Sequence, residues 1–139
     1  MVTHLSEIHV DTTDETDILD ITLEAQEIVL QSGVDNGSMV GFISGSTAAI
    51  TTIEFESGVV NDLRRAIARI APRDIAYEHD RRWGDGNGYA HVRAALLGPS
   101  LTVPIRQKRL LLGTWQQIVL LDFDNRPRTR TVVIQVMGE

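Results

Sequence analysis

The sequence predicts an α+β fold with mainly antiparallel sheets in a sandwich-like arrangement and two or three helices. Stretches typical of strands outnumber those typical of helices. The final strands follow one another with no helix between them, which favours antiparallel pairing over βαβ units. The chain has 139 residues, 42% of them hydrophobic, and shows no linker or internal repeat. We therefore predict a single domain, residues 1–139.

The first half of the chain alternates strands and helices. A strand is expected at residues 5–12, because apolar and polar residues alternate there. An acidic connection at 14–17 leads to a helix at 21–32, where apolar residues recur at helical spacing and Gly33 follows the last turn. Two further strands are expected at 38–44 and 49–55.

In the second half, a helix at 57–70 is expected to begin with Ser57 as its N-cap and to bury an apolar stripe. A third helix at 89–97 ends at Gly98-Pro99. The remaining strands are expected at 75–80, 101–105, 110–112, 114–123 and 129–137, with a loop at 81–88 and a hairpin turn at 125–128 joining the last two.

Composition excludes several classes of protein. There is no cysteine, so disulfides and thiolate metal sites are ruled out. A net charge of −6 and a pI of about 5.1 argue against nucleic-acid binding. No apolar run reaches membrane length, and the first residues lack a signal-peptide core, so we expect no membrane partner and a cytoplasmic location.

The richest polar stretch, residues 77–93, holds two of the four histidines, His79 and His91, together with carboxylates. A glycine-rich loop between the two histidines can fold them onto one centre. Two imidazoles and a carboxylate suit Zn²⁺ or a similar ion, so both histidines are candidate metal ligands. The alternative is a solvated loop in which one histidine caps a neighbour.

Three other features admit a functional and a structural interpretation. The small residues around Ser46 and Thr47 either let a backbone approach an anion or form a tight turn. Glu54, in an otherwise apolar strand, is either a general acid or base or half of an intersubunit salt bridge with Arg93 or Arg106. Arginines 126, 128 and 130 either bind phosphate or protect a strand edge.

A polar cluster at 113–117 interrupts an apolar strand. Buried amides and hydroxyls need partners, so the cluster points to a ligand pocket. Thr114, Trp115 and Gln116 are its candidate lining residues. The indole of Trp115 either forms an aromatic wall for a planar ligand or packs in the core.

In order and spacing, these motifs resemble the YjbQ family, small proteins described as secondary thiamine-phosphate synthases or left uncharacterised. The matching segments are Asp20-Ile21-Thr22, Ser32-Gly33-Val34, Asn36-Gly37, Ser46 to Thr51 with Glu54, Tyr77 to Asp80, Asn87-Gly88, His91, Gly98 to Pro104, Leu112 to Ile118 and Gly138-Glu139. Many members have histidine where this chain has Gly45, and His-Ser-His where it has Tyr89-Ala90-His91.

The resemblance implies an α+β homotrimer with a polar pocket near the subunit boundary. It also implies histidines able to hold a divalent metal, Zn²⁺ or Mg²⁺, and a reaction joining a pyrimidine pyrophosphate to a thiazole phosphate. We therefore expect an enzyme-like trimer that binds a phosphorylated or anionic small molecule. A non-catalytic metabolite- or metal-binding trimer and a metal-dependent hydrolase are the alternatives.

On this interpretation His79, His91 and Glu54 are the catalytic candidates, and the two histidines are the metal ligands. The residues expected to bind the small-molecule ligand are Ser46, Thr47, Asp80, Asn87, Arg93, Thr114, Trp115 and Gln116. Among them, Trp115 stacks on the pyrimidine and Gln116 reads its edge.

Overall fold

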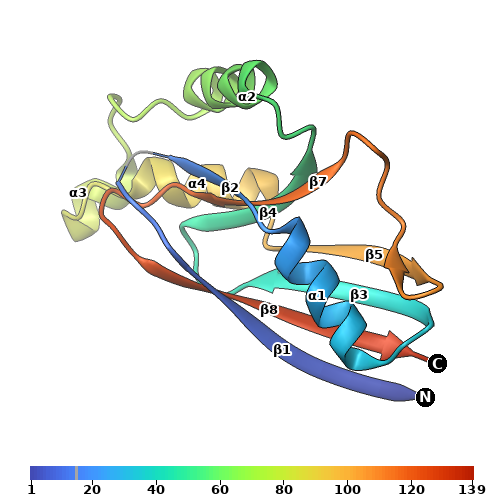
Figure 1. Cartoon of the computed structure of the whole chain (residues 1–139). Coiled ribbons are helices and arrows are strands. Elements are labelled where there is room, and N and C mark those ends of the chain that lie inside the picture. The colour runs from blue at the N-terminus through green and yellow to red at the C-terminus, as the bar shows by residue number, and fades with distance from the viewer. Residues whose placement is uncertain (15) are drawn as a thin grey trace.

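A computed structural model describes residues 1–14 and 16–139, which form eight strands and four helices (Figure 1). The strands are β1 (Val2–Asp11), β2 (Asp17–Asp20), β3 (Asn36–Ile43), β4 (Ala48–Ile53), β5 (Ser100–Arg106), β6 (Arg109–Leu110), β7 (Gln117–Asp122) and β8 (Thr129–Gly138). The helices are α1 (Thr22–Ser32), α2 (Ser57–Ile70), α3 (Glu78–Trp83) and α4 (Gly88–Leu97).

The strands form two sheets, and every strand pair is antiparallel. One sheet has the order β1-β8-β3-β5-β6, and the smaller one has the order β2-β7-β4. Figure 1 shows the larger sheet on one side of the molecule and the smaller sheet between it and α2. The predicted α+β class with sandwiched antiparallel sheets is confirmed.

Strand β7 explains how the layers are held together. Its residues Ile118, Val119, Leu120 and Leu121 are all fully buried. Ile118 and Leu120 belong to a core shared with α1 and the larger sheet, whereas Val119 and Leu121 belong to a second core shared with α2 and α4. Because side chains alternate across a strand, this continuous apolar run is what a strand between two cores requires.

The helices differ from the prediction in number and in one boundary. The helices predicted at 21–32, 57–70 and 89–97 are α1, α2 and α4 to within one residue. Residues 78–83 form α3, where a strand and a loop were predicted. The N-cap of α2 is Glu56 rather than Ser57, since the Glu56 carboxylate accepts the N–H groups of Gly58 and Val59. No helix in the described part of the chain is long and apolar enough to span a bilayer.

The predicted hairpin at 125–128 is wrong. Strands β7 and β8 do not pair with each other: β7 lies between β2 and β4, and β8 lies between β1 and β3. The four residues carry the chain from one sheet to the other. Strand β2, which was not predicted, occupies the edge of β7 that a hairpin partner needs. It is only four residues long and overlaps the stretch that was read as an acidic connection.

Candidate functional site

Helices α3 and α4 bring the two predicted histidines together. The rings of His79 on α3 and His91 on α4 have centroids 4.5 Å apart and are tilted by 48°. The carboxylate of Asp85, from the α3–α4 connection, lies 3.3 Å from His79 Nδ1. One donor atom from each of these three residues lies within 4.8 Å of the other two. We call His79, Asp85 and His91 the histidine cluster.

The short α3–α4 connection fixes this geometry. Asp80 Oδ1 accepts the backbone N–H of Gly88 at 2.8 Å and also lies 3.3 Å from His79 Nδ1. Asp85 Oδ1 accepts the N–H of Asn87 at 3.1 Å. These bonds satisfy N–H groups at the start of α4, which have no partner within the helix. They also hold both carboxylates on the side facing His79.

The contact between His91 and Ser46 determines which ring nitrogen is available. His91 Nδ1 lies 3.1 Å from the backbone oxygen of Ser46. A proton on Nδ1 donates to that carbonyl, which leaves the lone pair of Nε2 free to bind a ligand. Beside the ring is a groove of about 260 Å³ with mostly small lining residues: Gly45, Ser46, Ala48, His91, Ala94, Ala95 and Pro99.

The donor atoms of the histidine cluster fit a divalent metal. Zn²⁺ binds imidazole nitrogen and carboxylate oxygen at about 2.0–2.2 Å, so tetrahedral donors lie about 3.4 Å apart. His79 and Asp85 already have this spacing, and the full set needs side-chain shifts of about 1 Å to reach it. Three protein ligands leave a fourth position open, as in catalytic zinc sites.

A buried ionic network lies behind this cluster. Arg130 donates to both oxygens of Asp122, at 2.7 and 2.8 Å, and to Thr47 Oγ1 at 2.6 Å. Asp124, 1% exposed, accepts from Thr47 Oγ1 at 3.0 Å and from Asn87 Nδ2 at 3.3 Å. Burial raises the pKa of Asp124, but hydrogen bonds from Asn87, Thr47 and Arg128 outweigh it, so the net effect lowers the pKa.

Four of the predicted ligand-binding residues lie at or behind the cluster. Ser46 lines the groove, and Asp80 contacts His79. Thr47 and Asn87 are buried, with side chains bonded to Asp124, so they support the site rather than face a ligand. The loop around Ser46 is thus both a turn after β3 and one wall of the groove.

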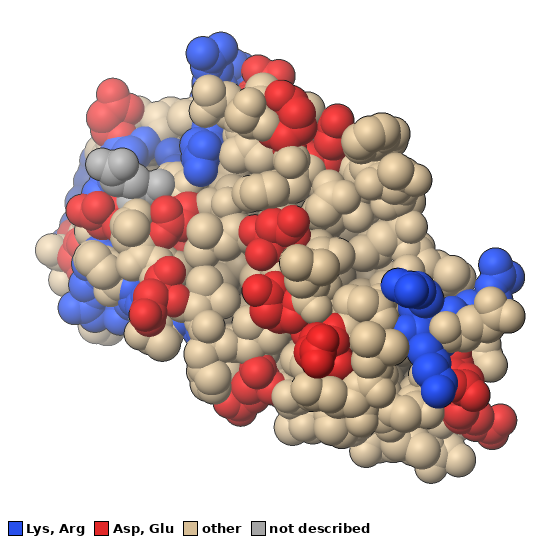
Figure 2. All heavy atoms as spheres, in the orientation of Figure 1, with Lys and Arg blue, Asp and Glu red and all other residues tan. Residues whose placement is uncertain are grey.

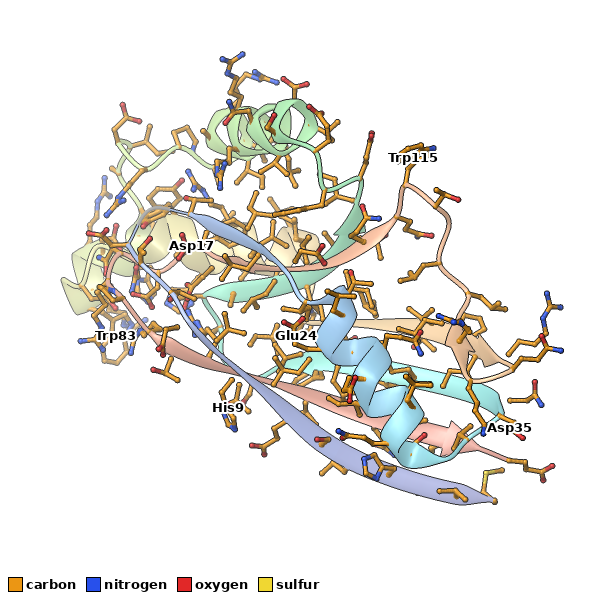
Figure 3. All side chains as sticks on the ribbon, in the orientation of Figure 1. His9, Asp17, Glu24, Asp35, Trp83 and Trp115 are labelled. Carbon is orange, nitrogen blue, oxygen red and sulfur yellow. The ribbon has the colours of Figure 1, made fainter. Side chains whose placement is uncertain are left out.

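Glu54 and the Trp115 loop lie elsewhere in the chain. Glu54 is exposed and follows β4 at the end away from Ala48, about 20 Å along the strand. The Trp115 loop is bound to that same end, since Gln116 Nε2 donates to Thr52 Oγ1 at 3.1 Å. Trp115 is 73% exposed, and Figure 3 shows it far from Trp83 of α3. Within one chain, Glu54, Thr114, Trp115 and Gln116 do not meet the histidines.

Arg93 also points away from the cluster. Its guanidinium is buried against the rings of Tyr89 and Phe123 and donates to the backbone oxygen of Ala71 at 2.9 Å. The expectation that arginines 126, 128 and 130 bind phosphate or protect an edge also needs correction. Arg130 and Arg128 pair with the buried Asp122 and Asp124, and only Arg126 is exposed.

The sequence interpretation did not single out Asp85. Its position between the two histidines, six residues after the first, was the available signal. The structure also separates positions 45 and 89, at which the resemblance implies histidines in many members. Gly45 borders the groove, whereas Tyr89 is buried in the second core, facing away from His91. Only position 45 is placed to add an imidazole near His91.

The fold and the cluster define a small antiparallel α+β protein with a candidate metal centre at a helix–helix junction. A family model described as UPF0047 protein YjbQ-like matches residues 6–139, and the chain belongs to this family. A UPF0047 protein of Archaeoglobus fulgidus is 34% identical over 131 residues, which cover 94% of this chain and 99% of the relative. The UPF0047 protein YugU of Bacillus subtilis is 34% identical over 135 residues, covering 96% and 99%.

Solved structures show the same architecture. A YbjQ-like protein of unknown function from Sulfolobus solfataricus superposes with a TM-score of 0.93 at 32% identity and covers 99% of this chain and 98% of its own. An uncharacterised YjbQ/UPF0047 family protein from Clostridium acetobutylicum superposes with a TM-score of 0.86 at 32% identity, covering 95% and 99%. The names of these relatives assign no activity.

Proposed function

We propose that the protein is a trimeric, metal-dependent enzyme that binds a small phosphorylated molecule at the histidine cluster. The observation that carries the proposal is the convergence of His79, Asp85 and His91, with donor atoms within 4.8 Å of one another. Two neutral imidazoles and one carboxylate form a donor set typical of zinc. The Ser46 carbonyl supplies the outer contact that orients His91.

The groove beside His91 suits the organic part of the ligand. Its alanine, glycine and proline residues leave room for a flat ring against α4, and it opens next to the cluster. A phosphorylated ring compound can therefore place its ring in the groove and its phosphate at the cluster. A divalent ion held there supplies positive charge to phosphate oxygens.

The family resemblance favours a transfer reaction of the thiamine-phosphate synthase type. The thiazole nitrogen attacks the pyrimidine methylene carbon, the bond from that carbon to the pyrophosphate oxygen breaks, and pyrophosphate leaves with the electron pair. The protein's part is to hold the two rings in line and to stabilise the leaving charge. The open fourth position of the donor set also suits hydrolysis of a phosphoester by a metal-bound water, which is the second candidate.

Assembly explains why the Trp115 loop can still belong to the site. In one chain it lies about 20 Å along β4 from the groove, so it reaches a histidine cluster only in another subunit. Large apolar side chains are exposed around this loop and on the outer face of the larger sheet: Leu5, Phe42, Phe55, Leu111, Trp115 and Met137. Exposed apolar surface of this kind is typical of subunit contacts.

Metal binding and turnover test the proposal. We expect the metal-free protein to bind about one Zn²⁺ per chain. His91→Ala or Asp85→Asn should weaken binding by at least about 10- to 100-fold, the effect that loss of an outer-shell partner already has. His9→Ala is the matched control, because His9 is exposed on β1 and belongs to no such cluster among the described residues. Calorimetric titration measures the affinity. Equal Zn²⁺ affinity in all these variants refutes the metal centre.

Turnover separates the candidate reactions. We expect the loaded protein to form thiamine phosphate from the pyrimidine pyrophosphate and thiazole phosphate, with product loss in the His91→Ala variant. Release of phosphate from simple phosphoesters without that product favours the hydrolase. Metal binding with neither activity leaves the non-catalytic binding trimer. Light scattering coupled to size exclusion measures the assembly, and a monomer at working concentration contradicts the trimer.

A further inference from the structure

The outer edge of β5 in the larger sheet faces the outer edge of β4 in the smaller sheet. Ile50 of β4 donates its backbone N–H to the carbonyl of Gly98 at 3.1 Å, so the connection from α4 to β5 passes along the edge of β4 at this point. Next to this hydrogen bond the two strands border a groove of about 270 Å³, which we call the edge groove. Its lining comes from residues 50–52 of β4, residues 100–104 of β5, and Leu97, Leu111, Leu112 and Gln116.

The hydrogen-bond pattern of β5 leaves part of its outer edge unpaired. Hydrogen-bonded residues alternate along an antiparallel strand pair. Ile43 of β3 donates its N–H to the carbonyl of Pro99 at 2.8 Å, so residues of β5 with odd numbers bond to β3 and those with even numbers point outward. The outward carbonyl of Pro104 accepts the N–H of Leu111 at 2.9 Å, in agreement with this alternation. Proline is tolerated at such a position, because its missing N–H is not needed for the pairing with β3.

Three residues therefore present unpaired backbone groups to the edge groove. On β5 they are Ser100 and Thr102, whose N–H and C=O groups have no hydrogen-bond partner among residues 1–14 and 16–139. On β4 the residue is Thr52. Its neighbour across the pair with β7, Ile118, donates to Thr22 Oγ1 at 2.8 Å instead, so the backbone groups of Thr52 point away from β7.

The lining of the edge groove is uncharged in the part of the chain that the structure describes. It consists of serine and threonine hydroxyls, one amide and aliphatic side chains. The amide of Gln116 is already bonded, since its Nε2 donates to Thr52 Oγ1 at 3.1 Å. Figure 2 shows uncharged surface over the loop before β7, between carboxylates near α2 and basic side chains near β6. This lining offers nothing to neutralise a charged ligand and therefore suits a neutral one.

Unpaired strand edges are templates for extended chains. A row of N–H and C=O groups can pair with a further strand, and many proteins recognise peptides in this way. Residues 100–104 span about 16 Å at the usual rise of a strand, which matches four or five residues of an extended peptide. Leu111, 47% exposed, adds an aliphatic surface for the side chains of such a peptide.

From these observations we infer that the edge groove binds an extended, uncharged peptide segment of a partner protein as an added strand. The segment pairs through its backbone with Ser100 and Thr102, and its other edge faces Thr52. A second copy of the chain fits less well. The other edge strand of the larger sheet, β1, has the exposed residues Glu7 and Asp11, whose charges do not suit an uncharged groove.

Titration with the peptide acetyl-Thr-Val-Thr-Val-Thr-amide, followed by the NMR signals of the backbone N–H groups, tests the inference. We expect the signals of Thr52, Ser100 and Thr102 to shift. Those of Thr51 and Val103 should shift less, since their N–H groups bond within the sheets. The same peptide methylated at every backbone nitrogen should bind at least about ten-fold more weakly, because it has no N–H groups to donate.

Thr102→Pro removes the outward N–H and keeps the pairing with β3, as proline does at position 104. It should weaken peptide binding at least about five-fold. Thr102→Val is the matched control, because it keeps the N–H and should leave binding nearly unchanged. The peptide comparison uses the wild-type protein, so it decides the question even where Thr102→Pro does not fold.

Two outcomes overturn the inference. One is equal binding of the two peptides, or no shift of these signals at millimolar peptide. The other is a lower oligomeric state of Thr102→Pro with no peptide binding by the wild type, which assigns the groove to a second copy. The metal centre is tested separately: the edge groove shares no lining residue with the groove beside His91, so His91→Ala should bind the peptide like the wild type.

Discussion

Asp124→Asn removes the charge at the centre of the buried network behind the histidine cluster and keeps the side-chain shape. The carboxylate accepts from Thr47 Oγ1, Asn87 Nδ2, Arg128 Nε and the N–H of Arg126. Asparagine retains one acceptor oxygen and turns its NH₂ group toward donors. At least one hydrogen bond is therefore lost, and Arg128 loses its anionic partner.

The size of the stability loss in Asp124→Asn follows from the burial of the Asp124 carboxylate. A hydrogen bond to a charged group contributes about 1.5–3 kcal/mol, and breaking a buried ion pair from one side costs about 3–5 kcal/mol. Arg128 is partly exposed and recovers some hydration, which places the expected loss near the lower values. We expect Asp124→Asn to lower the free energy of unfolding by about 3 kcal/mol at neutral pH, a large part of the usual 5–15 kcal/mol.

Equilibrium unfolding in urea measures this change, provided the slope with denaturant is unaltered. Asp62→Asn, an exposed carboxylate on α2, is the control and should change stability by no more than about 0.5 kcal/mol. Zn²⁺ affinity is the second readout. Asn87 loses a partner in the variant, and the connection that carries Asp85 becomes less ordered, so the affinity should fall. A loss below about 1 kcal/mol refutes the account of Asp124 as a buried, ionised partner.

The other predictions concern pH, assembly and helix packing. The folded-state pKa of Asp124 is lowered. The contribution of its carboxylate to the free energy of unfolding is therefore present above the usual aspartate pKa of about 3.9 and is lost as the pH falls through the folded-state pKa. The stability difference between wild type and Asp124→Asn should therefore shrink below about pH 4, and a constant difference down to pH 2 contradicts this. Trp115→Ala should weaken subunit assembly with little effect on folding, since the indole is exposed in one chain. Light scattering at several protein concentrations measures the assembly. Unchanged assembly argues against the Trp115 loop as a subunit contact. Gly88→Ala should lower Zn²⁺ affinity, because a Cβ there would lie 2.6 Å from Tyr77 Cβ and push α3 away from α4. Gly113→Ala is the control, since the nearest contact of a Cβ there is at 3.7 Å. Equal Zn²⁺ affinities of the two variants would refute this explanation.

Local patterns predicted most elements of the fold. Helices α1, α2 and α4 have the length and apolar spacing that a sequence window can register. Helix α3 has six residues and none of them is buried, so it has no apolar stripe to detect. Its stability comes from hydrogen bonds and packing against α4. Strand β2 has only four residues and became visible only through its pairing with β7.

The pairing of strands could not be predicted, because it depends on contacts remote in sequence. A turn such as Asn125 to Arg128 fits a hairpin locally, and nothing nearby shows that β7 is already paired on both edges. The double burial of β7 was the clue, since its unbroken apolar run fits a strand between two cores better than one with an exposed face.

For the site, residue chemistry was more informative than spacing. His79 and His91 were paired because imidazoles and carboxylates in one glycine-rich stretch suit a metal, and they do lie together. Glu54 was grouped with them on the expectation that its strand buried it. The strand ends at Ile53, so Glu54 falls on an exposed end remote from the cluster. Sequence order indicates which residue types are available but not which end of a strand they occupy.

Helix α4 carries both His91 of the histidine cluster and the buried Arg93. His91 faces the groove and Ser46 on one side, and Arg93 faces Thr16 and Ala71 on the other. The start of the helix is bound to Asp124 through Asn87, so a shift of α4 would move the histidine cluster relative to the buried network. Gly45 has φ near +116° and an ideal Cβ position 3.1 Å from Arg130, so a side chain there strains the backbone and crowds the same network. In the proposed metal centre Asp85 is the third donor, so the connection before α4 determines where that donor lies.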